Sequence, residues 1–199
     1  MRRPPRPYFR HWQHSTAAYV FPNTPAIFTF ALAIFLLHHA LGATPMNPPN
    51  YDSRLLNEIA AAADSSGDVA ARAKRVAEMI RSACGCGWTG FFKITETEAV
   101  AVAWTGNEAP AFLSFPLTRG ITRDVVKTRK TAVVNDVLKD ARYLVAFSTT
   151  RAEVIVPVTN SAGTVIGTLE ADSDKVNAFT AADVQFFEQC AARCSALFE

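Results

Sequence analysis

The chain has 199 residues and a formal net charge of +2, which is enough length for one domain with a sizeable core. Four arginines precede the first acidic residue, Asp52, so residues 52–199 carry 16 basic and 18 acidic side chains. That part has no basic stripe, which argues against nucleic-acid binding. All four histidines precede residue 40, so the rest lacks the usual general base, zinc ligand and haem ligand.

Residues 1–50 form a basic and apolar extension before the predicted domain. Early arginines, the apolar stretch 26–37 and small residues up to position 43 resemble a secretory signal. The stretch is shorter than the roughly 20 residues of a comfortable membrane span, although the residues up to 43 extend it. The alternatives are an exported chain, a membrane-anchored chain, and a start codon placed upstream of Met46. We favour the last, with a cytoplasmic domain, and expect membrane contact only if the segment is real.

The first half of the remaining sequence predicts two helices followed by three strands. Apolar residues recur with a helical period over 51–63 and 69–83, and Asp68 can cap the second helix. Strands are predicted at residues 88–94, 99–104 and 112–115.

The second half predicts a short helix at 121–128, a strand at 131–134, a hairpin over 152–171 and a helix over about 180–198. The order ααβββαβββα, with hairpins at both ends of the sheet, predicts an α+β domain spanning residues 51–199. We expect an antiparallel sheet with helices packed on one face and a loop-covered ligand pocket on the other.

Three segments of this region carry recognisable motifs, Trp88-Thr-Gly-Phe-Phe92, Ala152-Glu-Val-Ile-Val-Pro157 and Glu170-Ala-Asp-Ser173. Together they resemble the GAF domain, a small-molecule sensor fold. Within that fold they are most similar to the free methionine-R-sulfoxide reductases. Trp88-Thr-Gly-Phe-Phe92 is similar to that subgroup's Trp-Ala-Gly-Phe-Tyr. Ala152-Glu-Val-Ile-Val-Pro157 is similar to its Ser-Glu-Ile-Val-(Leu/Val)-Pro, and Glu170-Ala-Asp-Ser173 to its Asp-Ile-Asp-Ser.

The resemblance implies that Glu153, Glu170 and Asp172 line a ligand pocket, where crowded carboxylates could hold the ammonium of a free amino acid. It adds Trp88 and Tyr143 as further candidate ligand-binding residues. Without the resemblance, the pattern around Glu153 and Asp172 would favour a solvated strand face and a turn cap.

The chemistry of the resembling subgroup depends on cysteines that this chain lacks. The subgroup places them in a Gly-Val-Cys-Gly motif, ten residues before it, and in the loop before the Ser-Glu strand. Thr122, Phe112 and Ala146 occupy these positions here. A threonine hydroxyl is far less nucleophilic than a thiolate, and alanine and phenylalanine offer no nucleophile. We therefore predict a binding module for a small polar metabolite, such as a free amino acid or its sulfoxide, with no catalytic residues and no cofactor.

Two other functions compete with this prediction. One is a reductase that uses thiols outside the family positions, and the other is a ligand-free module that dimerises. Whether the domain binds a ligand or only dimerises, we expect a homodimer formed through the first and last helices. The four cysteines are Cys84, Cys86, Cys190 and Cys194. Their spacing gives only a weak four-thiolate metal signal, so core packing is the favoured interpretation and no metal site is predicted.

Overall fold

A computed structural model describes residues 51–106 and 108–199 as one antiparallel sheet with helices on both sides. The predicted extension over residues 1–50 lies outside the described residues. The sheet has six strands in the order β3-β2-β1-β6-β5-β4, and all neighbouring strands are antiparallel. The strands are β1 (Trp88–Ile94), β2 (Glu98–Gly106), β3 (Ser114–Pro116), β4 (Ala132–Val134), β5 (Ala152–Thr159) and β6 (Val165–Ser173).

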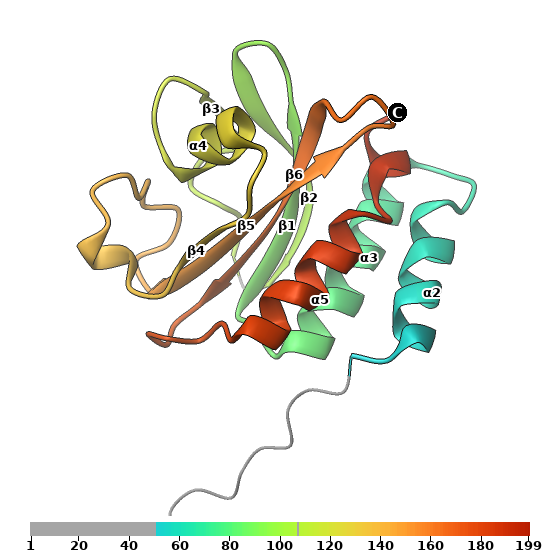
Figure 1. Ribbon diagram of the computed structural model, residues 1–199, viewed down its shortest axis with the longest axis horizontal. Helices are drawn as coiled ribbons and strands as arrows, with labels where there is room; N and C mark the ends of the chain where they lie inside the picture. Colours follow the sequence, from blue (N-terminus) through green and yellow to red (C-terminus); the bar gives the residue numbers. More distant parts are fainter. Residues whose placement is uncertain (1–50, 107) are drawn as a thin grey trace, which may run out of the picture. The chain divides into compact units, whose positions relative to one another are not determined.

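The helices divide between the two faces of this sheet, as Figure 1 shows. α3 and α5 cover one face, with α2 packed against these two helices, and α4 lies with the long loops on the other side. The helices are α2 (Ser53–Ala63), α3 (Val69–Cys84), α4 (Ile121–Thr128) and α5 (Ala181–Ala191), with 3₁₀ turns η1 (Val137–Lys139) and η2 (Ser195–Leu197). The predicted α+β fold, with its order of elements, is confirmed.

Local sequence sets the ends of the helices. The carboxylates of Asp52 and Asp68 accept hydrogen bonds from the backbone N–H groups of Leu55 and Ala71, the third residues of α2 and α3. These N–H groups would otherwise lack a partner at the start of a helix. Gly85 ends α3 with a φ of 66°, a left-handed conformation that glycine adopts without steric cost. At the start of α5, Thr180 and Asp183 form a reciprocal capping box.

The last helix is shorter than its sequence pattern predicts. The predicted helix runs to about residue 198, whereas α5 ends at Ala191 and the chain turns through η2. The turn buries Leu197 and packs the ring of Phe198 edge-on against Phe91, with centroids 6.2 Å apart. Tertiary packing of these apolar side chains therefore overrides the helical period.

The main core lies between the helices and the sheet. Ile80 from α3 and Phe187 from α5 are fully buried there, against Val154 of β5 and Leu169 of β6. In the described part of the chain, no helix is both long enough and apolar enough to cross a membrane. The apolar stretch that resembles a signal is outside that part, so its role stays a prediction.

Candidate functional site

The strand face opposite the main core carries the predicted acidic residues. In the β5–β6–β1 register, Glu153 lies opposite Asp172, and Asp172 lies opposite Trp88. One row along, Ile155 lies opposite Glu170. Because side chains alternate between faces along a strand, this register gathers the three carboxylates and the indole on the same side. These four of the five predicted ligand-binding residues are therefore neighbours.

Trp88 can lie against the sheet because the residue two positions along β1 is glycine. A Cβ atom built on Gly90 would come within 2.3 Å of the Trp88 ring. On another side of the indole, the ring of Phe147 packs with a centroid separation of 5.5 Å. Gly90 thus provides the space that places the indole at the wall of a pocket.

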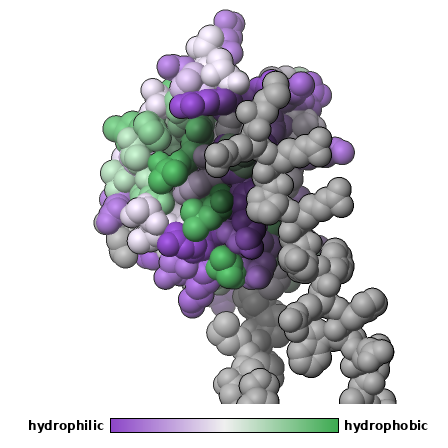
Figure 2. Space-filling model, turned by 90° about the vertical axis from the view of Figure 1, so that its left-hand side faces the viewer, coloured by the Kyte–Doolittle hydropathy of each residue, from purple (hydrophilic) through white to green (hydrophobic). Residues whose placement is uncertain are grey.

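The pocket lies between this strand face and the loops that follow β2 and η1. It has an empty volume of about 510 Å³, part of which is open to solvent. Figure 2 views the side of the molecule that carries α4 and these loops, where hydrophobic patches lie among hydrophilic residues. The pocket is lined by Trp88, Phe92, Pro110, Phe112, Phe115, Ile121, Thr122, Leu144, Ala146, Phe147, Glu153, Ile155, Glu170 and Asp172.

The three positions where the resembling reductases carry cysteine all lie on this pocket wall. Phe112, Thr122 and Ala146 come from three separate segments, yet each lines the same pocket. Among the described residues, the lining contains no thiol, and it also contains no lysine, arginine or histidine. The site described here thus combines buried acids with apolar walls and lacks a nucleophilic sulfur.

Glu170 is the most fully hydrogen-bonded of the three acids. Its Oε1 accepts hydrogen bonds from the hydroxyls of Thr168, at 2.9 Å, and Thr122, at 3.2 Å. The threonine in the cysteine position therefore supports a carboxylate. By contrast, the buried Asp172 Oδ1 and the buried Trp88 Nε1 have no hydrogen-bond partner in the described residues. An unpaired acceptor and an unpaired donor at one pocket wall are suited to a polar ligand.

Burial sets the protonation of the acids. All three are at most 9% exposed, and removal from water disfavours their charged forms. Burial raises the pKa of Glu170 to about 7, against the opposing effect of its two hydroxyl donors. Burial and the charge of Glu170 raise the pKa of Asp172 to about 8. Burial, followed by the charges of Asp172 and Glu170, raises the pKa of Glu153 well above its usual range.

Tyr143, the fifth predicted ligand-binding residue, is half-buried and lies outside the pocket lining. Its side chain packs against a small apolar cluster around α4, and its hydroxyl donates a 3.4 Å hydrogen bond to the carbonyl of Phe147. Contact between Tyr143 and a ligand stays a prediction. Its place in the structure is to hold the loop that carries Phe147.

Several residues that line or support the pocket are not among the residues predicted from the sequence. Phe92 and Ile155 follow Trp88 and Glu153 at even spacing along their strands, so the two-residue period could have indicated them. Pro110 and Leu144 come from irregular loops with no periodic signal. Thr168 could have been found as the residue two positions before Glu170 on the same face of β6.

The cysteines lie away from the pocket lining. Cys84 and Cys86 form a disulfide with Cα atoms 5.4 Å apart, while Cys190 and Cys194 are free thiols buried in the core. Cys194 also lies beyond the end of α5. In residues 51–106 and 108–199, no group of three or more histidine, cysteine or acidic side chains could hold a metal ion.

Comparison with known families decides which fold this is. The family model described as "GAF domain" matches residues 63–199. The chain belongs to the GAF domain family. GAF domains are in general small-molecule-binding or signalling modules, and the predicted family resemblance is confirmed.

Individual relatives of this GAF domain include another GAF domain-containing protein and an enzyme. GAF domain-containing protein A of Dictyostelium discoideum is 31% identical over 103 residues, which cover 51% of this chain and 63% of that protein. The chain therefore matches less than two thirds of this relative. The free methionine-R-sulfoxide reductase from Neisseria meningitidis, solved with its substrate, is 27% identical with a TM-score of 0.65, covering 72% of this chain and 86% of that one.

A more distant structure shows how widely the fold occurs. The GAF domain from the Acinetobacter phosphoenolpyruvate-protein phosphotransferase has a TM-score of 0.67 at 17% identity, covering 75% of this chain and 93% of that one. At that identity only the fold is shared. The ligand of the present GAF domain must therefore be argued from its own pocket.

Proposed function

We propose that this GAF domain binds a small metabolite that carries a protonated amine, such as a free amino acid or its sulfoxide, without chemically converting it. The observation that carries the proposal is the set of three buried acids, Glu153, Glu170 and Asp172, on a pocket wall without a basic residue. None of the ion pairs in the described residues includes one of these acids. A ligand ammonium would supply the missing positive charge.

The rest of the pocket supports a ligand with both polar and apolar parts. The unpaired Trp88 Nε1 offers a donor to a ligand oxygen, such as a carboxylate or a sulfoxide. The rings of Phe92, Phe115 and Phe147 offer an apolar surface to a side chain. The likeness to a reductase solved with its substrate favours the same chemical class of ligand.

The absence of sulfur from the lining supports binding without turnover. Reduction of a sulfoxide by this route needs an attacking thiolate beside the ligand. Phe112, Thr122 and Ala146 fill the three family positions, and Thr122 is engaged with Glu170. A pocket of this kind can recognise a ligand and pass the signal to another protein. The predicted homodimer through α2 and α5 is one way to transmit it, and it stays a prediction that light scattering of the full chain would test.

The proposal is tested by calorimetric titration of the full chain with free L-methionine-R-sulfoxide and other free amino acids. N-acetyl-L-methionine-R-sulfoxide serves as the matched probe, because acetylation removes the ammonium. We expect binding of the free amine, at least tenfold weaker binding of the acetylated form, and at least tenfold weaker binding by Glu153→Gln. At a hundred times the dissociation constant, the ligand should add about 2.7 kcal/mol of stability.

Glu98→Gln is the control variant, since Glu98 is an exposed acid on β2 outside the pocket. Equal affinity for the acetylated and free forms, or no binding of any free amino acid, would contradict the proposal. Methionine formed from the sulfoxide in the presence of dithiothreitol, measured by amino-acid chromatography, would show turnover and replace binding by reduction.

A further inference from the structure

The disulfide between Cys84 and Cys86 occupies the connection between α3 and β1. Cys84 is the last residue of α3, and Cys86 precedes Trp88 by two positions. Cys84 is half-buried and the intervening Gly85 is exposed, while Cys86 is only 7% exposed. Cys84 is therefore the more exposed of the two cysteines, and it is the one that an external thiol would reach first.

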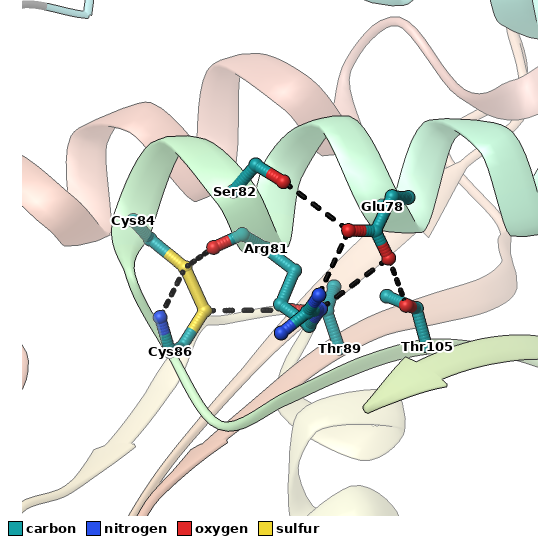
Figure 3. A network of polar contacts seen from close by, with 7 residues as sticks. All are labelled: Glu78, Arg81, Ser82, Cys84, Cys86, Thr89 and Thr105. Carbon is teal, nitrogen blue, oxygen red and sulfur yellow. Dashed lines mark hydrogen bonds and ion pairs between the residues drawn. A yellow bond between two sulfur atoms is a disulfide. The ribbon is translucent and has the colours of Figure 1, made fainter. Parts of the chain in front are cut away.

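Both sulfurs have neighbours suited to the oxidised and the reduced state (Figure 3). Thr89 Oγ1 lies 3.4 Å from Cys86 Sγ, and it can donate to a disulfide sulfur or to a thiolate. Cys84 Sγ lies 3.5 Å from the carbonyl oxygen of Arg81, which can accept from a Cys84 thiol once the disulfide is reduced. The backbone N–H of Cys86 also points at Cys84 Sγ, at 3.2 Å. The site therefore offers hydrogen-bond partners before and after reduction.

This disulfide is expected to add little to the stability of the folded chain. It links residues separated by two positions, so it removes little chain entropy from the unfolded state. A contact to the sheet also holds this end of α3, because the Glu78 carboxylate accepts a hydrogen bond from Thr105 of β2 in addition to those from Arg81 and Ser82 within the helix. Those contacts, shown in Figure 3, would hold the helix end in either redox state.

The same connection leads directly to the pocket wall. The N–H of Gly87 donates a 3.0 Å hydrogen bond to the carbonyl of Asp172, and Trp88 pairs with Asp172 in the sheet. Gly87, Trp88 and Asp172 also line a second hollow beside the ligand pocket. Only Gly87 separates Cys86 from the indole of Trp88, and the backbone of Gly87 is hydrogen-bonded to that of the buried Asp172.

We propose that Cys84 and Cys86 form a thiol–disulfide exchange site whose redox state sets the position of Trp88 at the pocket wall. Its co-reactants are small or protein dithiols and their disulfides. The inference does not depend on which ligand occupies the pocket. Nothing in the exchange needs the buried Cys190 and Cys194, whose thiol pKa values are raised by burial.

The exchange conserves atoms and electrons. A thiolate of the dithiol attacks the accessible Cys84 Sγ, the Cys84–Cys86 bond breaks, and Cys86 leaves as a thiolate that takes up a proton. The second thiol of the reagent then attacks the reagent sulfur that is bonded to Cys84 Sγ. This closes the reagent's own disulfide, and Cys84 leaves and takes up the proton of the second thiol. The reagent is oxidised to a disulfide by two electrons, and the protein disulfide is reduced to two thiols.

The test equilibrates the folded full chain in mixtures of reduced and oxidised dithiothreitol. Peptide mass spectrometry after alkylation counts the Cys84 and Cys86 thiols, and tryptophan fluorescence follows the pocket wall. We expect both cysteines to convert together without denaturant, with a fluorescence change along the same redox curve. Trp88→Phe should lose that change, whereas Trp104→Phe should keep it. Cys84→Ser/Cys86→Ser should show no response to the reductant.

A Cys190→Ala/Cys194→Ala variant controls for the core thiols, and it should retain the transition of the wild type. The inference is overturned if the disulfide does not form in oxidised dithiothreitol, or if it is reduced only after the domain is unfolded by urea. It is also overturned if complete reduction leaves Trp88 fluorescence unchanged. None of these results bears on whether an amine ligand binds, which the titrations above decide separately.

Discussion

The two faces of strands β5 and β6 have opposite characters, although they are built from alternate residues of the same segments. On one face, Val154 and Leu169 pack against α3 and α5 in a continuous apolar core. On the other face, Glu153 and Glu170 are also buried, with 9% and 6% of their surface exposed, and no ion pair within the described residues includes them. The first face gains stability from burial, and the second bears the desolvation cost of its acids.

The difference between the faces separates folding from binding. The core face has apolar groups that need no partner, so it is complete in the free protein. The pocket face keeps an unpaired donor at Trp88 and an unpaired acceptor at Asp172. Sites that are arranged for a ligand commonly reduce the stability of the free protein. Variants on the two faces should therefore have different consequences.

Among single substitutions, truncation of a core side chain should cost the most stability. Phe187 is fully buried and contacts the rings of Phe179 and Phe186, so Phe187→Ala should lower the free energy of unfolding by about 3–5 kcal/mol. The matched change on the pocket side is Phe112→Ala, since Phe112 is 50% exposed. It should change stability by less than about 1 kcal/mol. Urea denaturation of both variants tests the contrast, and equal losses would contradict it.

An intermediate effect is expected where the pocket wall approaches the backbone. Gly90→Ala introduces a methyl group that would overlap the Trp88 ring, so the indole must move. We expect a loss of about 1–3 kcal/mol in the free energy of unfolding, together with weaker ligand binding. Gly87→Ala is the control, because its Cβ would meet only the Asp172 carbonyl at an ordinary 3.6 Å. Unchanged affinity in Gly90→Ala would argue against a ligand contact by Trp88.

The pH dependence of stability distinguishes the two faces without any substitution. Glu170 and Asp172 have folded-state pKa values of about 7 and 8, above their ordinary values of 4.5 and 3.8. The folded state therefore binds more protons than the unfolded state across this window. The free energy of unfolding should then fall as pH rises from about 4 to about 8, by at most about 1.4 kcal/mol per pH unit for each group.

Two measurements check that sign. Urea denaturation between about pH 5 and about pH 8 should give a declining stability that is flatter in Glu170→Gln. The affinity for a cationic amine should rise over the same range, because the ionised acids pair with it. A flat stability profile in the wild type would show that the acids are ionised in the free pocket. An affinity that falls with pH would contradict their pairing with an ammonium.

Most of the fold could be predicted from the sequence, because helix caps, turns and hydrophobic periods are local signals. The bounds of β1 and α4 were predicted as found, and Asp68 caps α3 as expected. The prediction was wrong at the end of α5, where the helical period continues but the chain turns to bury Leu197 and Phe198. That choice depends on the sheet surface available to these side chains, which no local pattern contains.

The α+β order of elements and the alternation that separates core from pocket residues can both be read in the sequence. The same holds for the absence of cysteine at positions 112, 122 and 146, where the resembling reductases carry it. The tertiary structure was needed to show that these three positions line one pocket. It was also needed to show that Trp88 Nε1 and Asp172 Oδ1 lack hydrogen-bond partners in the described residues. It also placed the Cys84–Cys86 disulfide next to the pocket wall. The physical reason is that spacing fixes the direction of each side chain along its own strand, whereas strand register and loop packing determine which side chains meet.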